Sequence, residues 1–280
     1  MGHDAAVLSS CKRRPAVCVD QTIEGVHFLS ETPPKRIAEK AVGRALSDLA
    51  ATAASPRQIL LSLSAPKSKT DRWMRAVIAG AKQRAAEFGA DLVAGDLACA
   101  PGSVHLSVTA IGEVLGGGRP PGRDRARPGQ VVLATGPTGG SLRGRHLKIK
   151  PLVEEGLWLH KNGATAMMDV SDGLAIDLSR ICSSSEVGID LERIRVHRDA
   201  RWMEKCDGVS ALEHALTDGE DHELIATMSQ ANWNRAKRSA AHRFPAMEVV
   251  GVVRKKGGLR IPSENGEWKS WRGRGGWLHG

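Results

Sequence analysis

The chain has 280 residues, 41% of them hydrophobic and 25% charged, and carries a formal net charge of +9. This length is enough to bury a real hydrophobic core and predicts two domains. No apolar run is long enough to cross a membrane and no signal peptide opens the chain, so we expect a cytoplasmic protein.

The positive charge predicts an anionic partner, either nucleic acid or a phosphorylated small molecule. The sequence contains no RNA-binding aromatic motif and no zinc-finger spacing. Much of the excess charge lies in short clusters such as 12–14 and 254–256, which are typical of solvated faces. A polyphosphate ligand is therefore the better-supported anion.

The five cysteines show no CxxC spacing, and their number is odd. We therefore expect free thiols in a reducing compartment, in agreement with the cytoplasm.

Strands and helices alternate from the start of the chain. Residues 16–20, AVCVD, predict a short apolar strand that ends in Asp20. A helix opened by two prolines follows, and we expect it to reach about Ala53. Asp48 lies among small apolar residues near its end, where an acid is costly unless it is paired or metal-bound. We interpret Asp48 as a ligand rather than a surface residue.

The next segments continue this alternation. Residues 58–64 predict a strand, and Thr70 is expected to cap the following helix. Residues 91–96, DLVAGD, predict a buried strand whose carboxyl end carries Gly95 and Asp96. Carboxylates thus recur at strand ends.

A domain connection is predicted in the middle of the chain. Residues 103–114 alternate as a strand with one wet face. The loop 116–130 is rich in Gly, Pro and Arg, which is typical of a connection between domains. We therefore expect an N-terminal domain over 1–115 and a C-terminal domain over 116–280.

The second half opens with a strand at 131–136. The glycines and serine of 136–141 form a possible anion-holding turn, although they fit neither a Walker nor a dinucleotide pattern. A helix that ends at Gly163 leads to the next strand.

Residues 167–179, MMDVSDGLAIDLS, hold three carboxylates around one serine and one glycine. We expect Asp169 to leave the carboxyl end of a strand and Asp172 to sit at a helix N-terminus, with Ser171 or Asp172 as the cap. α/β proteins hold phosphates in such crevices, and carboxylates tolerate phosphate when Mg²⁺ lies between them. The alternative is a capped strand-to-helix turn without a ligand.

The last third adds a strand at 187–192, an acidic turn at 217–224 and a basic helix at 229–243. The acidic turn places Glu220 and Asp221 where loops meet the sheet. The tail holds tryptophans among glycines and arginines, which can stack on a heterocycle or, more commonly, close off a core.

Seven motifs occur in order: GHDAAVL, CVDQTIEGVHF, SDLAA, AGD, RxxARPG, MDVSDGL and GEDHEL. Together they resemble the thiamine-monophosphate kinase family of the aminoimidazole-ribonucleotide-synthetase-like superfamily, over nearly the whole chain. DVSDGL and GED are shared across that superfamily, whereas EGVHF followed by SDLAA indicates the kinase branch.

The resemblance implies ATP-dependent phosphorylation of thiamine phosphate to thiamine diphosphate with several Mg²⁺ ions. A substrate phosphate oxygen would attack the γ-phosphorus in line, so catalysis would rest on positioning and charge neutralisation. The implied fold is α/β with two domains. Its N-terminal mixed sheet would pair with its twin in a homodimer, and ATP would bind near that interface.

The resemblance also implies roles for individual residues. The implied metal ligands are Asp4, Asp20, Asp48, Asp96, Asp169 and Asp172, with Cys18 and Val19 at two further metal positions of the family. The implied ATP contacts are Gly95, Asp96, Arg123 and Ser171. The implied acceptor contacts are His27, Glu220 and Trp277, although a lone histidine such as His27 is more often structural.

Several positions depart from the family pattern. His3 replaces the first Asp of Gly-Asp-Asp, and Cys18-Val19 replaces Ser-Thr before Asp20. The segment that precedes Gly-Asp-Asp in the family is absent, so we interpret Met1 as an internal start. We expect these departures to affect the number of bound metal ions and the turnover rate more than the fold.

Two other functions are compatible with the sequence. A degenerate, non-catalytic nucleotide-binding protein is favoured by the departures, and a basic nucleic-acid binder is favoured only by net charge.

Overall fold

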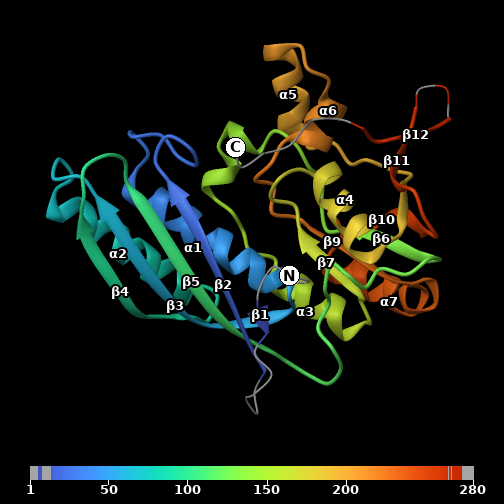
Figure 1. The fold of residues 1–280 in the computed structure, drawn as a ribbon, viewed down its shortest axis with the longest axis horizontal. Helices are drawn as coiled ribbons and strands as arrows, with labels where there is room; N and C mark the ends of the chain where they lie inside the picture. The colour runs from blue at the N-terminus through green and yellow to red at the C-terminus, as the bar shows by residue number, and fades with distance from the viewer. Residues whose placement is uncertain (1–5, 8–13, 264, 266, 273–280) are drawn as a thin grey trace.

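Two β-sheets lie side by side in the computed structural model, which describes residues 6–7, 14–263, 265 and 267–272 (Figure 1). The first sheet has five strands in the order β1-β2-β5-β3-β4, and the second has seven in the order β12-β11-β8-β10-β6-β9-β7. Both sheets contain parallel and antiparallel pairs. The predicted α/β class, with two sheets that carry helices, is confirmed.

The first half of the chain builds the first sheet and two helices. Its strands are β1 (Ala6–Val7), β2 (Pro15–Ile23), β3 (Ala54–Ala65), β4 (Asp91–Cys99) and β5 (His105–Val114). Its helices are α1 (Pro34–Ala51) and α2 (Asp71–Ala86). The predicted cap of α2 is confirmed, because the Thr70 side chain accepts a hydrogen bond from the backbone N–H of Trp73.

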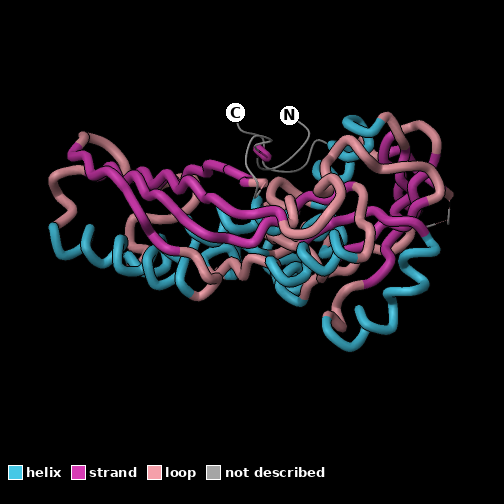
Figure 2. The backbone as a smooth tube through the Cα atoms, turned by 90° about the horizontal axis from the view of Figure 1, so that it is seen from below, coloured by secondary structure: helices cyan, strands magenta, loops and turns pink. Residues whose placement is uncertain are grey.

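Helices α1 and α2 cover one face of the first sheet and leave the other face open (Figure 2). On β5, Leu106, Val108 and Ala110 are buried, whereas the alternate residues Ser107 and Thr109 are half-exposed. The prediction of one wet face for this strand is confirmed. Burial of the inward residues against the helices forms the core of this half.

Strand β4 is exposed, so the prediction of a buried strand at 91–96 is wrong. The strand lies at the sheet edge and pairs with β3, and the exposed fractions of Val93 and Leu97 are 50% and 53%. A short apolar run has the same pattern whether a strand is central or at an edge, because only tertiary neighbours decide its burial.

The second half of the chain builds the second sheet. Its strands are β6 (Gln130–Ala134), β7 (Ala166–Asp169), β8 (Gly188–Leu191), β9 (Leu224–Ser229), β10 (Glu248–Arg254), β11 (Gly258–Pro262) and β12 (Trp268–Ser270). Its helices are α3 (Val153–Lys161), α4 (Leu174–Ser185), α5 (Arg198–Asp207), α6 (Ala211–Thr217) and α7 (Gln230–Arg243), with 3-10 turns η1 (Ser141–Arg143) and η2 (Arg145–Leu147).

The acidic motif joins β7 to α4, as predicted, and Asp169 is the last residue of its strand. The predicted cap is wrong, because Gly173 is the N-cap of α4 and no side chain caps the helix. Gly173 adopts a φ of +122°, a conformation that glycine enters without strain. The backbone N–H of Asp172 instead donates to the carboxylate of Asp177 one turn into the helix (3.0 Å).

The carboxyl end of α1 packs against the second half of the chain. Ala50 and Ala51 share a buried apolar cluster with Trp158 and Leu159 of α3 and with residues of the second sheet. The helices approach closely, because a Cβ added at Gly156 would lie 2.2 Å from the carbonyl oxygen of Ala50. Helix α1 therefore belongs to both cores and fixes the two sheets relative to each other.

The loop between the two sheets runs from the end of β5 to the start of β6. It contains the segment predicted as a domain connection, and we retain 1–115 and 116–280 as the proposed domains. Within the described parts of the chain, no helix has the length and apolar character that a membrane span requires.

Replacing Gly156 with alanine tests the contact between α1 and α3. The added methyl group must push the helices apart, so we expect a loss of about 1–3 kcal/mol in the free energy of unfolding. Gly117→Ala is the matched control, since no atom lies within 4 Å of its added Cβ. Urea unfolding measures both, and equal stability of the two variants would contradict the close packing.

Candidate functional site

A polar cavity of about 170 Å³ lies between the two halves of the chain. Its walls come from β2, α1, the loop before β6, the end of β7, α4 with the loop before it, and the acidic turn before β9. It is lined by Asp20, Arg44, Asp48, Arg123, Asp169, Ser171, Asp172, Arg180, Glu220 and His222. We call it the acidic cavity, because five carboxylates face it.

Helix α1 directs a polar stripe toward the second half of the chain. Lys40, Arg44, Ser47 and Asp48 recur at spacings of three and four residues, which places them on one face of the helix. Most other buried residues of α1 are alanine, leucine, isoleucine or valine and pack on the first sheet. The helix thus divides its surface between a core and a site.

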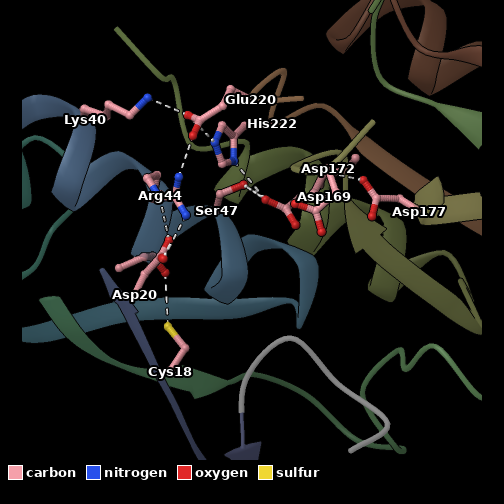
Figure 3. Close-up of polar contacts among 12 residues, drawn as sticks. Cys18, Asp20, Lys40, Arg44, Ser47, Asp169, Asp172, Asp177, Glu220 and His222 are labelled. Carbon is pink, nitrogen blue, oxygen red and sulfur yellow. Dashed lines mark hydrogen bonds and ion pairs between the residues drawn. The ribbon is translucent and has the colours of Figure 1, made fainter. Parts of the chain in front are cut away.

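Glu220 is the meeting point of two buried cations of this stripe (Figure 3). Its carboxylate accepts hydrogen bonds from Lys40 Nζ at 2.7 Å and from Arg44 Nη1 at 2.5 Å. The same guanidinium forms a fork on Asp20, with Nε 2.9 Å from Oδ2 and Nη2 3.0 Å from Oδ1. Burial would raise the pKa of Glu220, but His222, Arg44 and Lys40 outweigh it and hold the pKa well below its usual range.

His222 connects Glu220 to Asp169. Its Nδ1 lies 2.9 Å from Asp169 Oδ2, and its Nε2 lies 3.7 Å from Glu220 Oε2. Burial alone would lower the pKa of His222, but the hydrogen bond with Asp169 and the negative charges of these two carboxylates raise it to about 9. The imidazole is therefore a cation at neutral pH. Ser47 also donates to Asp169 Oδ2 (2.7 Å), so this carboxylate is held from both halves of the chain.

The acidic turn reaches this position through an unusual backbone. Glu220 and His222 have φ values of +63° and +54°, which are rare for residues with a Cβ. The N–H of Glu220 donates to Ser171 O at 2.7 Å and that of His222 to Val170 O at 2.8 Å. Backbone strain of this kind persists where the surroundings over-determine it, and it clusters at functional sites.

Asp48 differs from the other carboxylates of the cavity. Among the described residues it makes no ion pair, although Asp169 and Asp20 lie near it. Burial and these two neighbouring charges raise the pKa of Asp48 well above its usual value. The charged form of Asp48 therefore needs a cation beside it, and a divalent metal ion bound to its oxygens would be such a cation.

Arg180 holds the two acids at the start of α4. Its Nη1 contacts Asp172 and lies 2.7 Å from Asp177 Oδ1. Asp177 is fully buried, and burial raises its pKa to about 7 in spite of Arg180. Arg123, predicted as an ATP contact, also faces this wall, where burial lowers its pKa against the attraction of Asp169.

A second cavity of about 350 Å³ adjoins the first and shares Glu220 with it. His27, Phe28, Lys40 and residues 142–144, 146 and 147 contribute to its lining. His27 is buried, and its Nδ1 accepts a hydrogen bond from Ile23 N (3.1 Å). Burial, followed by Arg44, lowers its pKa to about 4, so His27 is neutral at pH 7. The structure therefore brings His27 and Glu220 to one cavity across most of the sequence.

Other predicted site residues lie elsewhere. Asp20 aligns across the first sheet with Val108, Leu61 and finally Gly95, so three strand spacings, roughly 14 Å, separate it from β4. Gly95 and Asp96 are thus apart from the acidic cavity within one chain. Val19 is 64% exposed on the open face of the sheet, whereas Cys18 is buried beneath α1. Asp4, His3 and Trp277 lie outside the described residues.

The predicted glycine turn does hold anions, but they belong to the protein itself. The N–H of Gly139 donates to Asp221 Oδ2 and that of Gly140 to Asp218 Oδ2, each at 2.7 Å. Arg145 also pairs with Asp221. This turn therefore anchors the back of the acidic turn rather than offering free N–H groups to a ligand.

The acidic cavity contains suitable oxygen donors for Mg²⁺, but they are not gathered into a ready ligand set. Over residues 14–263 and the short described segments, no three acidic, histidine or cysteine side chains form a cluster able to hold a metal ion. Asp20 and Asp172 face arginines, and Asp169 faces His222. The uncompensated Asp48 beside Asp169 is the position that best fits a divalent cation.

Sequence reasoning missed the cations of this site, namely Lys40, Arg44, Arg180 and His222. The available signal was the position of Lys40 and Arg44 on the otherwise apolar face of a predicted helix. A buried cation at such a position requires a buried acid as its partner.

Comparisons with known proteins show what the chain is similar to. Residues 2–114 match the profile "AIR synthase related protein, N-terminal domain", and residues 134–263 match its C-terminal domain. The chain is 36% identical to the thiamine-monophosphate kinase of Corynebacterium glutamicum over 253 residues, which cover 81% of this chain and 76% of that protein. It is 30% identical to the enzyme of the same name from Bacillus subtilis, over 91% and 85% of the two chains.

The fold is also similar to solved structures. The structure described as "AaThiL complexed with AMPPCP and TMP" superposes with a TM-score of 0.87 at 26% identity and covers 100% of this chain and 91% of that chain. The thiamine monophosphate kinase of Stenotrophomonas maltophilia has a TM-score of 0.80 at 28% identity, over 94% and 92%.

The His222 imidazolium predicts a pH-dependent stability of the metal-free protein. Its folded pKa of about 9 lies above the ordinary value of 6.5, so its contribution is complete below about pH 6.5 and is lost as the pH rises through 9. The contribution is at most about 3 kcal/mol. Urea unfolding at pH 6.5 and 10 should show this loss, and His222→Gln should reduce it. The exposed His242→Gln is the control, and an unchanged difference in His222→Gln would refute the assignment.

Proposed function

Since this chain belongs to the thiamine-monophosphate kinase family of the AIR synthase related proteins, we propose that it transfers the terminal phosphoryl group of ATP to thiamine phosphate. The product is thiamine diphosphate. The observation that carries the proposal is the pair of adjoining cavities that share Glu220, one acidic and one lined by His27. Their contact allows a donor and an acceptor phosphate to meet.

The acidic cavity is the proposed nucleotide side. Asp48 is the best candidate to hold Mg²⁺, since it makes no ion pair with a described residue, and Asp169 is the carboxylate beside it. The metal would neutralise the triphosphate and so allow one anionic phosphate to approach another. Arg123 and Ser171 line the same wall and are the proposed contacts to ATP. An acceptor phosphate is ionised at neutral pH, so the site requires no strong general base.

The cavity with His27 is the proposed acceptor side. Thiamine phosphate carries a positive thiazolium ring and a negative phosphate. Glu220 stays ionised and offsets Lys40 and Arg44, while the neutral His27 adds no positive charge beside the thiazolium. The phosphate would point toward the acidic cavity, where His222 and Arg44 provide positive charge.

A homodimer is the proposed assembly. The open face and the β4 edge of the first sheet expose Val19, Val93 and Leu97, which a second copy would cover. Asp96 lies on the open face in register with Ser62, so a second copy would also bring its own Gly95 and Asp96 toward the nucleotide. We further propose a cytoplasmic location, where ATP is supplied and thiols such as those of Cys99 and Cys206 stay reduced.

The direct test is incubation with ATP, Mg²⁺ and thiamine phosphate, followed by chromatographic detection of thiamine diphosphate.

Asp48→Asn should lower turnover at least 100-fold, because it removes a charge that the metal requires. The melting temperature of the metal-free variant should stay equal or rise, since burial beside Asp169 and Asp20 disfavours the charge of Asp48. Asp91→Asn, exposed on β4, is the control. Near-normal turnover of Asp48→Asn would reject the metal role. Binding of Mg·ATP without transfer in the unaltered protein would favour the non-catalytic alternative.

The acceptor side makes a separate prediction. Glu220→Gln leaves Lys40 and Arg44 partly uncompensated, and their charge should repel the thiazolium ring. We expect the KM for thiamine phosphate to rise at least 10-fold while the Kd of Mg·ATP changes less than threefold. Glu31→Gln, exposed near the same cavity, should change neither value. Equal loss of both affinities would place Glu220 at the nucleotide instead, provided that the variant remains folded by circular dichroism.

A further inference from the structure

Arg44 lies between two carboxylates of the site and contacts both at once (Figure 3). Nε and Nη2 bind the two oxygens of Asp20 at 2.9 and 3.0 Å, and Nη1 binds Glu220 Oε1 at 2.5 Å. The side chain of Arg44 is 11% exposed. The guanidinium is therefore an enclosed, doubly paired cation, not a surface arginine.

The charge of Arg44 occupies the place that a metal ion would need at Asp20. A planar guanidinium donates to both carboxylate oxygens and stays protonated when buried. It therefore supplies a permanent positive charge, as a bound metal ion would. Asp20 and Asp169 both act electrostatically on Asp48, yet of these three Asp48 alone makes no ion pair with a described residue. The guanidinium of Arg44 thus neutralises Asp20, and Asp48 remains available to bind a metal ion from solution.

We infer that Arg44 substitutes for one divalent cation at Asp20, so that the site binds one metal ion fewer than its carboxylates would bind without this arginine. The inference rests on the proposed function, because it concerns the ions that accompany the nucleotide. It assigns Asp48 and Asp169 to the remaining metal position and makes Asp20 a partner of Arg44 alone.

The alternative to this inference is that a metal ion displaces Arg44 from Asp20. The guanidinium would then lose two of its three hydrogen bonds while Glu220 still holds its Nη1. It has little room to reach solvent, in contrast to Arg180, whose side chain is 37% exposed. Burial and the second acid therefore favour retention of Arg44 over its displacement.

Counting bound Mn²⁺ tests the inference without any turnover. Electron paramagnetic resonance gives the number of Mn²⁺ ions per chain, with and without a methylene-bridged ATP analogue. Arg44→Met should bind one more ion than the unaltered protein under the same conditions. Arg44→Lys, which keeps the charge, should bind the same number as the unaltered protein. Arg57→Met removes a surface arginine paired with Glu113 and serves as the control.

A second set of variants covers the case in which Arg44→Met does not fold. Asp20→Asn in the unaltered background should leave the Mn²⁺ count unchanged, because Arg44 already holds this carboxylate. Asp48→Asn should lower the count by one. Equal counts in Arg44→Met and the unaltered protein, or a loss of one ion in Asp20→Asn, would overturn the inference. Failure of phosphoryl transfer with these counts intact would instead reject only the proposed function.

Discussion

The ion-pair network around Glu220 is the interaction on which the rest of the structure depends. It joins Lys40 and Arg44 of α1 to the acidic turn before β9, and it continues through His222 to Asp169 at the end of β7. The links from Lys40 and Arg44 to Glu220 cross from the first half of the chain to the second. Removing one partner of such a buried pair typically costs about 3–5 kcal/mol, because the remaining charge has no solvent. The two halves are therefore tied together at the site itself.

The network also explains the strained acidic turn. Glu220 and His222 both line the acidic cavity, and the backbone is left-handed at each of them. Asp221 between them then points backward to Gly139 and Arg145, where burial raises its pKa to about 7. Ionic and hydrogen-bond contacts on both sides of the turn offset the strain. The geometry of the cavity thus depends on the packing of the glycine turn behind it.

Most elements could be predicted from local pattern, but the pairing within the site could not. Periodicity and turn residues indicate α1, β7 and the acidic turn, because strand ends and helix faces are local properties. The partners of Asp20 could not be predicted, since the position of Arg44 on the helix indicates only that it needs a buried acid, and the fold alone decides that Asp20 and Glu220 supply it. The burial of β4 and the cap of α4 were predicted wrongly because both depend on tertiary neighbours. The predicted metal and ATP roles remain predictions.

The shared carboxylate couples the two cavities electrostatically. Any cation that approaches Asp20 changes the field at Arg44, and Arg44 transmits this change to Glu220 over hydrogen bonds of 2.5 to 3.0 Å. Charged pairs with little solvent around them are weakly screened, so the coupling survives at physiological salt. The charge state on the acidic side therefore sets the field on the other side through a fixed guanidinium. A chain that lacked an arginine at position 44 would keep the link through His222, which reaches Asp169 but not Asp20.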